Sequence, residues 1–415
     1  MNPPTRPDRR AFLRRGSVLA AASLTAFADE KFDLVIRGGE VVDPSQSLRG
    51  HRDVGIRWGR VAAVEPSIDP GRALQAIDAK GHLVVPGLVD LHAHVYAQGS
   101  ALGLPADELA PFTATTTYVS SGDAGSGNFS ALRHYIIAQA RSRIFAFVHI
   151  SRIGLAGFPV GETLNIDYAD VDDAAKTVAE NADVVLGVKV RMSKNVVGTH
   201  GLEPLVRAIA AAERAGPGFR VQCHIGDAPG ALPALLDLLR PGDILTHAYS
   251  GAGNNIVQDG RILPAAIAAK QRGVVIDVGH GGGSFDYTVA EPAMAQGLVP
   301  DTISSDIHAV SGNTPGQPYL PWVMSKFLNL GLDLEQVIAM ATVNPARVIG
   351  RVEKLGTLEV GAPADVSILQ LVEEPVTFVD TRGNRRDGKR WLKPIQAIRA
   401  GRPFGRPYPM PFAYP

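Results

Sequence analysis

The chain has 415 residues, enough for one large domain with an appendage or for two domains. It is 45% hydrophobic and 20% charged, which is the composition of a packed globular protein and excludes a disordered one. Its 41 basic and 41 acidic residues cancel and no basic stripe is present, so the charge balance gives no indication of nucleic-acid binding.

The first segment has the features of an export signal. The sequence RRAFL at 9–13 precedes an apolar stretch of about a dozen residues, too short to span a bilayer. The stretch ends in AFA at 26–28, a small-x-small cleavage pattern. It resembles a twin-arginine signal, so we expect cleavage of residues 1–28 after Ala28 and a periplasmic mature protein without stable membrane insertion. A basic tail or an uncleaved anchor is the alternative.

Patterns typical of short β-strands occur at both ends of the chain. Valine- and isoleucine-rich runs with Gly, Asp and Pro between them occupy residues 29–86, and similar runs return within residues 349–415. Two β-rich ends around a long middle predict one small β-sandwich domain built from both termini. Cys223 is the single cysteine, so this fold has to hold without an intrachain disulfide.

The middle, residues 87–348, alternates apolar strands with amphipathic helices such as those expected at 128–143 and 203–216. Eight such units over roughly 250 residues predict an α/β fold, a (β/α)₈ TIM barrel. A doubly wound open sheet is the alternative, but no glycine fingerprint follows the first strand. The expected strands cover residues 87–95, 113–122, 144–151, 183–192, 220–227, 242–251, 274–282 and 301–308.

Polar side chains interrupt these strands near their carboxyl ends, where barrel enzymes place their chemistry. His92 and His94 are two residues apart on the first strand, so both imidazoles face the barrel interior. A lone strand-end histidine such as His149 is more often a core residue. A set repeated at equivalent ends of several strands instead indicates a metal site, because imidazoles and carboxylates bind zinc and similar ions. The set is His92, His94, His224, His247 and Asp306.

Three further features of the sequence bear on this set. Lys189 lies near the end of an otherwise apolar strand, where a charged ammonium group loses hydration at a cost of several kcal/mol. Asp306 alone is compatible with a helix N-cap, but beside a metal site it is better interpreted as a ligand and a proton shuttle. The glycine-rich run at 280–283 lacks the lysine and the spacing of a phosphate loop. His280, at its start, is expected either to face the substrate or to be structural.

Together these residues resemble the amidohydrolase superfamily with a binuclear metal centre. The resemblance rests on PGLVDLHAHV, the lysine on the fourth strand, single histidines on the fifth and sixth, the aspartate on the eighth, and TVNPARVIGRVEKLGTLEVGAPADVSIL near the C-terminus. It covers nearly the whole mature chain. The motifs GLVDLHAHVY, SSGDAGSGNF, GVKVRMS, DVGHGGGSF and SSDIHA are most similar to the bacterial amidohydrolase/deacetylase group, whose members hydrolyse N-acyl or O-acyl groups, including those of acetylated 2-hydroxy acids.

The resemblance implies a ligand set and a mechanism. Two divalent ions are expected, zinc foremost, with Mn²⁺ and Fe²⁺ left open, and Lys189 would be carboxylated by CO₂ to bridge them. A hydroxide held between the ions would attack the acyl carbon, since metal coordination lowers the pKa of water towards about 7. Asp306 would act as general base and then as general acid, so Lys189 and Asp306 carry the catalytic roles. The implied metal ligands are His92, His94, Lys189, His224, His247 and Asp306.

The predicted function is a metal-dependent hydrolase that cleaves an ester or a non-peptide amide bond of a small carboxylate-bearing substrate. Arg191 and Ser193 share the strand face of Lys189, and Arg191 is a candidate for binding the carboxylate, with a salt bridge at the rim as the alternative. Tyr96 and His280 are weaker candidates for the pocket wall. The rivals are a cyclic-amide hydrolase of the dihydroorotase or hydantoinase kind and a non-catalytic scaffold. No nucleic-acid partner is expected, and a homo-oligomer is left open.

Overall fold

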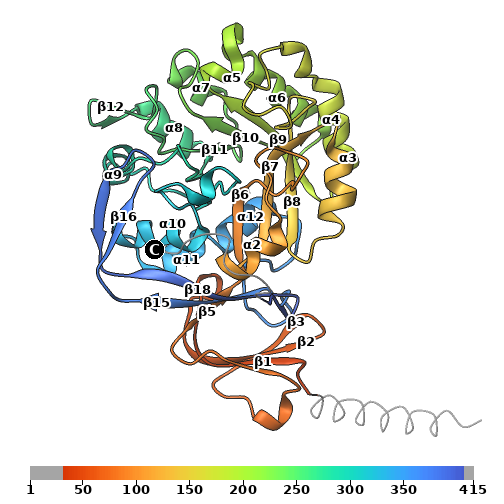
Figure 1. Ribbon diagram of the computed structural model, residues 1–415, viewed down its shortest axis with the longest axis vertical. Helices are drawn as coiled ribbons and strands as arrows, with labels where there is room; N and C mark the ends of the chain where they lie inside the picture. The colour runs from red at the N-terminus through yellow and green to blue at the C-terminus, as the bar shows by residue number, and fades with distance from the viewer. Residues whose placement is uncertain (1–30, 406–415) are drawn as a thin grey trace, which may run out of the picture.

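The computed structural model describes residues 31–405 of the chain. The export signal and cleavage site expected within residues 1–28 lie outside the described residues and stay predictions. Among the described residues, no helix has the length and apolar character needed to cross a membrane. Figure 1 shows a large part, in which helices surround a curled sheet, and a smaller sheet beneath it.

The large part is built on seven parallel strands in the spatial order β14-β11-β10-β9-β8-β7-β6. All side chains of β7 and nearly all of β9 are buried, as expected for parallel strands covered on both faces. The predicted α/β barrel class is confirmed. The strands are β6 (Leu88–Ala93), β7 (Thr115–Gly125), β8 (Arg143–His149), β9 (Val185–Met192), β10 (Arg220–Ile225), β11 (Ile244–Thr246) and β14 (Val275–Ile276).

The eighth expected strand, residues 301–308, does not form a regular strand. It makes single parallel bridges to both neighbours, from Thr302 to Asp277 and from Ile307 to Ala93, and so closes the ring between β14 and β6. The strands β11 and β14 are also shorter than expected. Each is followed closely by a residue with positive φ, His247 at 62° and Gly279 at 49°, where the chain leaves the extended conformation.

The helices between the strands follow the sequence pattern with one exception. The helix expected at 128–143 is wrong in extent: only α3 (Phe129–Ala131) and the π-helical η4 (Leu132–Ile137) form. The chain turns out of helical geometry where the N–H groups of Arg141 and Ser142 donate to Asp107. The other helices are α2 (Ala106–Thr113), α4 (Val171–Glu180), α5 (Lys194–Val197), α6 (Glu203–Ala215), α7 (Leu232–Leu238), α8 (Pro264–Gln271), α9 (Tyr287–Ala295), α10 (Leu320–Asn329), α11 (Leu334–Met340) and α12 (Val343–Ile349).

Both ends of the chain contribute to the smaller part, as the sequence predicts. Its eight strands form one sheet in the order β19-β18-β15-β5-β1-β2-β3, with β4 on β1, and β15 aligns Ile368 opposite Val84 of β5. The sheet carries its own apolar core, which includes Ile36 and Val366. The strands are β1 (Leu34–Asp43), β2 (Leu48–Arg57), β3 (Arg60–Glu65), β4 (Ala76–Asp78), β5 (Leu83–Pro86), β15 (Val366–Val372), β18 (Trp391–Arg399) and β19 (Arg402–Pro403), and two hairpins elsewhere are β12 (Val257–Gln258) with β13 (Arg261–Ile262) and β16 (Val376–Val379) with β17 (Arg385–Gly388).

Candidate metal centre

Three predicted ligands meet where β6 and the ring-closing segment end. The ligand atoms of His92, His94 and Asp306 all lie within 4.8 Å of one another, and all three residues are buried. Oδ1 of Asp306 is 3.2 Å from Nε2 of His92 and 3.0 Å from Nε2 of His94. The Asp306 N–H donates to the His92 carbonyl at 2.7 Å, which ties the aspartate to β6. Asp306 has φ 48°, a strained backbone conformation of the kind that clusters at functional sites.

The remaining predicted ligands adjoin this group. The imidazole centroids of His247 and His92 are 4.9 Å apart, and those of His247 and His224 are 4.3 Å apart. Nζ of Lys189 lies 3.2 Å from Nε2 of His92. The structure therefore brings all six residues of the implied ligand set into one cluster, from β6, β9, β10, the residue after β11 and the ring-closing segment.

A hydroxyl fixes the tautomer of His92. Nδ1 of His92 is 2.7 Å from Oγ1 of Thr246, and Oγ1 of Thr246 donates to Oδ2 of Asp277 at 2.8 Å. A hydroxyl has a single hydrogen, so Thr246 has to accept from the Nδ1–H of His92. The lone pair of His92 is then on Nε2, which faces Asp306 and Lys189. Outer partners of this kind orient metal-binding histidines.

Two other histidines, His94 and His247, also have a hydrogen-bond partner at Nδ1. Nδ1 of His94 lies 2.9 Å from Oδ1 of Asp123, a buried carboxylate that also accepts from the hydroxyls of Ser100 and Ser120. Nδ1 of His247 donates to the carbonyl of Gly279 at 2.5 Å. In both rings Nε2 is the atom left to act as a ligand.

The electrostatics suit binding of a cation. Burial lowers the pKa of His92 and His224 well below the usual value, and that of His247 to about 4, so these imidazoles are neutral at pH 7. Burial lowers the pKa of His94 too, but Asp123 and Asp306 outweigh it and raise the pKa to about 9. Burial disfavours the Asp306 carboxylate, yet His92 and His94 hold its pKa well below its usual range. A carboxylate beside three neutral imidazoles, with a fourth paired to carboxylates, is a donor set that fits a divalent metal.

Lys189 is buried beside this set, with Nζ also 3.2 Å from Oε1 of Gln222. Burial lowers the pKa of Lys189 to about 7, so a substantial fraction of the amine is neutral at physiological pH. Gly122, with φ 81°, faces the side chain, and a Cβ there would lie 2.5 Å from Cγ of Lys189. The absence of a side chain at Gly122 thus leaves room for the lysine side chain. The lysine places a nucleophilic nitrogen among the metal-ligand candidates.

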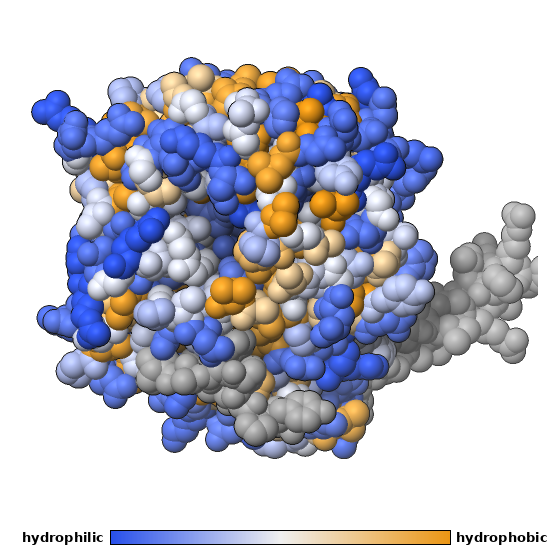
Figure 2. All heavy atoms as spheres, turned by 45° about the horizontal axis from the view of Figure 1, so that its top comes forward, coloured by the Kyte–Doolittle hydropathy of each residue, from blue (hydrophilic) through white to orange (hydrophobic). Residues whose placement is uncertain are grey.

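The cluster opens into a cavity of about 340 Å³. The barrel strands run away from the terminal sheet (Figure 1). Figure 2 brings the opposite face of the molecule forward and shows a hollow with hydrophilic residues inside it and both hydrophilic and apolar residues around its rim. Arg191 lines the cavity, bonded to the buried carboxylate of Glu162 and with its guanidinium carbon 5.8 Å from the ring centroid of Phe158. The lining residues are His92, His94, Leu102, Leu155, Phe158, Lys189, Arg191, His224, Gly282, Gly283, Ser284, Asp306, His308, Val310 and Thr314.

The other expected substrate contacts lie outside that lining. Oγ of Ser193 is 3.2 Å from Nε2 of His224, so Ser193 contacts a candidate ligand. The hydroxyl of Tyr96 bonds to the carbonyl of Asn128 at 3.4 Å. His280 is fully buried, with Nδ1 2.8 Å from the carbonyl of Gly281 and Nε2 2.7 Å from Nζ of Lys326. Of the two alternatives for His280, this geometry supports the structural one.

Sequence reasoning missed the residues behind the ligands. Asp123, Thr246 and Asp277 orient histidines or their partners, and His308 lines the cavity with its ring centroid 5.7 Å from that of His94. Only His308 had a signal, since it lies two residues after Asp306 in SSDIHA.

Known proteins are similar to this chain in sequence and in fold. Residues 285–396 match the Amidohydrolase family. A deacetylase of Agrobacterium fabrum is 36% identical over 342 residues, which cover 82% of this chain and 83% of that protein. The chain belongs to the amidohydrolase family. Two crystal structures, of an adenine deaminase and of a dihydroorotase, each have a TM-score of 0.82 and cover 90% of this chain, with 30% and 31% identity and 100% and 99% of their own chains covered.

Membership defines the class of chemistry. This amidohydrolase is a metal-dependent hydrolase that acts on amide or ester bonds. A deacetylase of Enterococcus faecalis, 31% identical over 374 residues, covers 89% of this chain and 98% of its own length, so the similarity extends through both structural parts.

Proposed function

We propose that the protein is a deacetylase-type amidohydrolase that cleaves an acyl ester or amide of a small substrate bearing a carboxylate. Two divalent ions, zinc foremost, would be held by His92, His94, Lys189, His224, His247 and Asp306, with Lys189 carboxylated on Nζ. The observation that carries the proposal is the shared cavity, in which an arginine stands in the wall above the ligand cluster. The relatives named deacetylase support the same reaction.

The residues divide the work as follows. Bound metal ions would polarise the scissile carbonyl and lower the pKa of a water molecule. Asp306, ionised at neutral pH, accepts a proton at its carboxylate during attack and returns it to the leaving amine or alkoxide. Arg191, oriented by Glu162 through one terminal nitrogen, keeps other N–H groups for a substrate carboxylate. Phe158 and Leu155 supply apolar wall, which excludes water from the reacting bond.

The fitted surroundings of Lys189 support its carboxylation. The amine is buried, partly neutral, and adjacent to His92 and Gln222. Reaction of the neutral amine with CO₂ forms a carbamate and releases one proton. The carbamate of Lys189 would supply two anionic oxygens, which would compensate the charge of two neighbouring cations inside the barrel.

A substrate panel tests the proposed function. We expect hydrolysis of O-acetyl 2-hydroxy acids or N-acetyl amino acids, with kcat/KM at least about tenfold higher than for the matching carboxamides, which lack the charge that Arg191 binds. Turnover of dihydropyrimidines or hydantoins alone would contradict the proposal. It would establish instead the cyclic-amide hydrolase that the structural likeness to a dihydroorotase keeps as the second candidate.

We also propose that the protein is exported to the periplasm through its twin-arginine-type signal, with cleavage after Ala28. The sequence at 9–28 is the support for this. Fractionation of producing cells should find the mature chain in the periplasm, and replacing both Arg9 and Arg10 by lysine should retain the full-length chain inside the cell. Unchanged distribution of that variant would contradict export by this route.

A further inference from the structure

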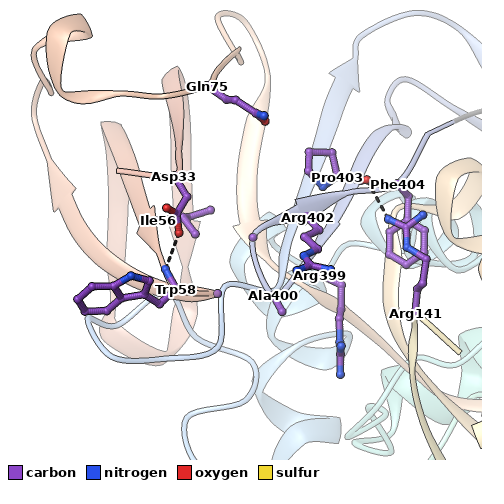
Figure 3. A pocket seen from close by; sticks show the side chains of 12 residues that line it. Asp33, Ile56, Trp58, Gln75, Arg141, Arg399, Ala400, Arg402, Pro403 and Phe404 are labelled. Atoms are coloured by element: carbon purple, nitrogen blue, oxygen red, sulfur yellow. Dashed lines mark hydrogen bonds between the residues drawn. The ribbon is translucent and has the colours of Figure 1, made fainter. Parts of the chain in front are cut away.

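A second cavity, of about 600 Å³, lies at the opposite end of the barrel. Arg141, in its wall, comes just before β8 begins, whereas the metal ligands lie at the carboxyl ends of the strands. The other walls are the turn between β2 and β3, with Trp58, and the β18–β19 hairpin, with Arg399 and Arg402. Figure 3 shows Asp33, Ile56 and Trp58 on one side of the space and the arginines with Phe404 on the other.

The lining is electropositive. Arg141, Arg399 and Arg402 face a single acidic residue of the lining, Asp33, whose carboxylate already accepts the Trp58 N–H at 2.6 Å. Arg141 lies over the Phe404 ring, 4.5 Å from its centroid, and donates to the Pro403 carbonyl at 3.1 Å. The stacking holds this guanidinium in place while leaving most of its N–H groups to other acceptors.

Arg399 lacks a protein partner for its charge. Among residues 31–405, its guanidinium makes no hydrogen bond or ion pair, and Nε is buried without an acceptor. Burial lowers the pKa of Arg399 and the neighbouring Arg143 adds to the effect, while the charges of Asp365 and Asp107 oppose it in part. Nearby carboxylates are engaged elsewhere, because Asp365 accepts from Arg143 and the Ala400 N–H and Asp107 accepts from two backbone N–H groups. A half-buried unpaired guanidinium is costly unless an anion compensates it.

We propose that this cavity is a binding site for a small oxyanion, a phosphate or carboxylate group, held by Arg399 and Arg402 with Arg141 at its edge. A guanidinium matches such groups because its planar fork donates two parallel hydrogen bonds to paired oxygens. The bound anion joins the β18–β19 hairpin to the barrel and neutralises the unpaired charge, so it stabilises the fold from the end remote from the reaction.

Titration of the metal-loaded full chain with inorganic phosphate tests the site, with acetate as a separate arm and chloride at equal ionic strength as the reference. Calorimetry and the melting temperature are both read. We expect saturable binding of one of the two anions, weakened about tenfold or more by Arg399→Gln and by Arg402→Gln. Arg402 is exposed, so its variant keeps the fold even if Arg399→Gln does not. The arm that saturates identifies the anion as a phosphate or a carboxylate.

Arg261→Gln is the matched control, because Arg261 is an exposed arginine on the β13 hairpin, away from this cavity. It should bind the anion as the wild type does. Phosphate also stabilises proteins by exclusion from their surfaces, and this effect is common to all variants. Binding that is equal in wild type, Arg399→Gln and Arg402→Gln, as for an anion at the metal centre, would overturn the proposal, as would no saturable binding of either anion.

Discussion

At the scale of single residues, ligand orientation depends on a hydrogen-bond relay. The hydroxyls of Thr246, Thr302 and Ser304 all donate to Asp277, at 2.6 to 2.8 Å. Because the hydroxyl of Thr246 is committed in this way, it can only accept from His92. Through this relay Asp277, which is not itself a candidate ligand, determines which nitrogen of His92 is free to bind a metal.

Thr246→Val is therefore expected to weaken metal binding while leaving the shape of the core nearly unchanged. Loss of an outer partner of a metal ligand typically costs about 10- to 100-fold in metal affinity or activity. Competition with a chelator measures the affinity, and excess metal should restore part of the activity.

Thr177→Val is the control for this prediction, since Thr177 donates its hydroxyl to the Asp173 carbonyl on helix α4, at the barrel surface. It should keep wild-type metal affinity. Equal affinities in the two variants would show that the relay does not orient His92.

Sequence reasoning could find the candidate ligands but not this relay. His92 and His94 stand at strand spacing, and Lys189 interrupts an apolar strand, so each is visible locally. Asp277, Thr246 and Asp123 are ordinary polar residues within strands or beside them. Their role depends on which strands become neighbours, such as β11 beside β14, and on side-chain contacts that no linear spacing encodes.

At the scale of elements, the glycine-rich segment after β14 has a steric role that its sequence did not indicate. Gly281 has φ 54°, and a Cβ there would lie 2.3 Å from Oδ2 of Asp306. The Gly281 N–H donates to the Ser305 carbonyl at 2.9 Å, which holds the segment against the one that carries the aspartate. The glycine leaves the space that the Asp306 carboxylate occupies.

Gly281→Ala is expected to lower kcat/KM by about 100-fold or more, because the methyl group displaces Asp306 and a small misplacement of a catalytic group has an effect of this size. Gly253→Ala, where the nearest atom to the added methyl group would be 3.9 Å away, is the matched control. Steady-state kinetics on the best acetylated substrate compare the two. Wild-type kinetics for Gly281→Ala would contradict the steric account.

The elements themselves were predictable to different degrees. The buried strands β7 to β10 match the apolar runs because continuous burial leaves a strong pattern. The segment 301–308 has an apolar-to-polar pattern but pairs through isolated bridges, and Asp306 turns to positive φ to reach the histidines. The contacts of Asp306 with His92 and His94 thus replace regular strand pairing there.

At the scale of the whole molecule, the buried histidines couple folding to pH once metal is removed. Burial lowers the pKa of His149 to about 3 and of His247 to about 4, against 6.5 when unperturbed. Below pH 6.5 the unfolded chain therefore takes up protons that the folded chain does not. The free energy of unfolding consequently decreases as the pH is lowered. His94, with a pKa of about 9, and Asp306, with a lowered pKa, both keep their contributions across this interval.

The metal-free protein should lose about 3 kcal/mol of unfolding free energy through His247 alone between about pH 6.5 and about pH 4. Urea unfolding of chelator-treated protein at steps across this range measures the change, and the metal-loaded protein should change less because metal competes with the protons. An unfolding free energy that stays constant over the range would contradict the buried, neutral state of these rings.

The central claim is a two-metal centre that depends on Lys189, and metal stoichiometry tests it most directly. Elemental analysis should find about two equivalents of divalent metal in the wild type and in Lys194→Ala, a surface control, and fewer than one in Lys189→Ala. Activity should fall with the metal and return in part when short carboxylic acids are added with bicarbonate. A wild type with less than one equivalent, or a fully active Lys189→Ala enzyme, would contradict the account.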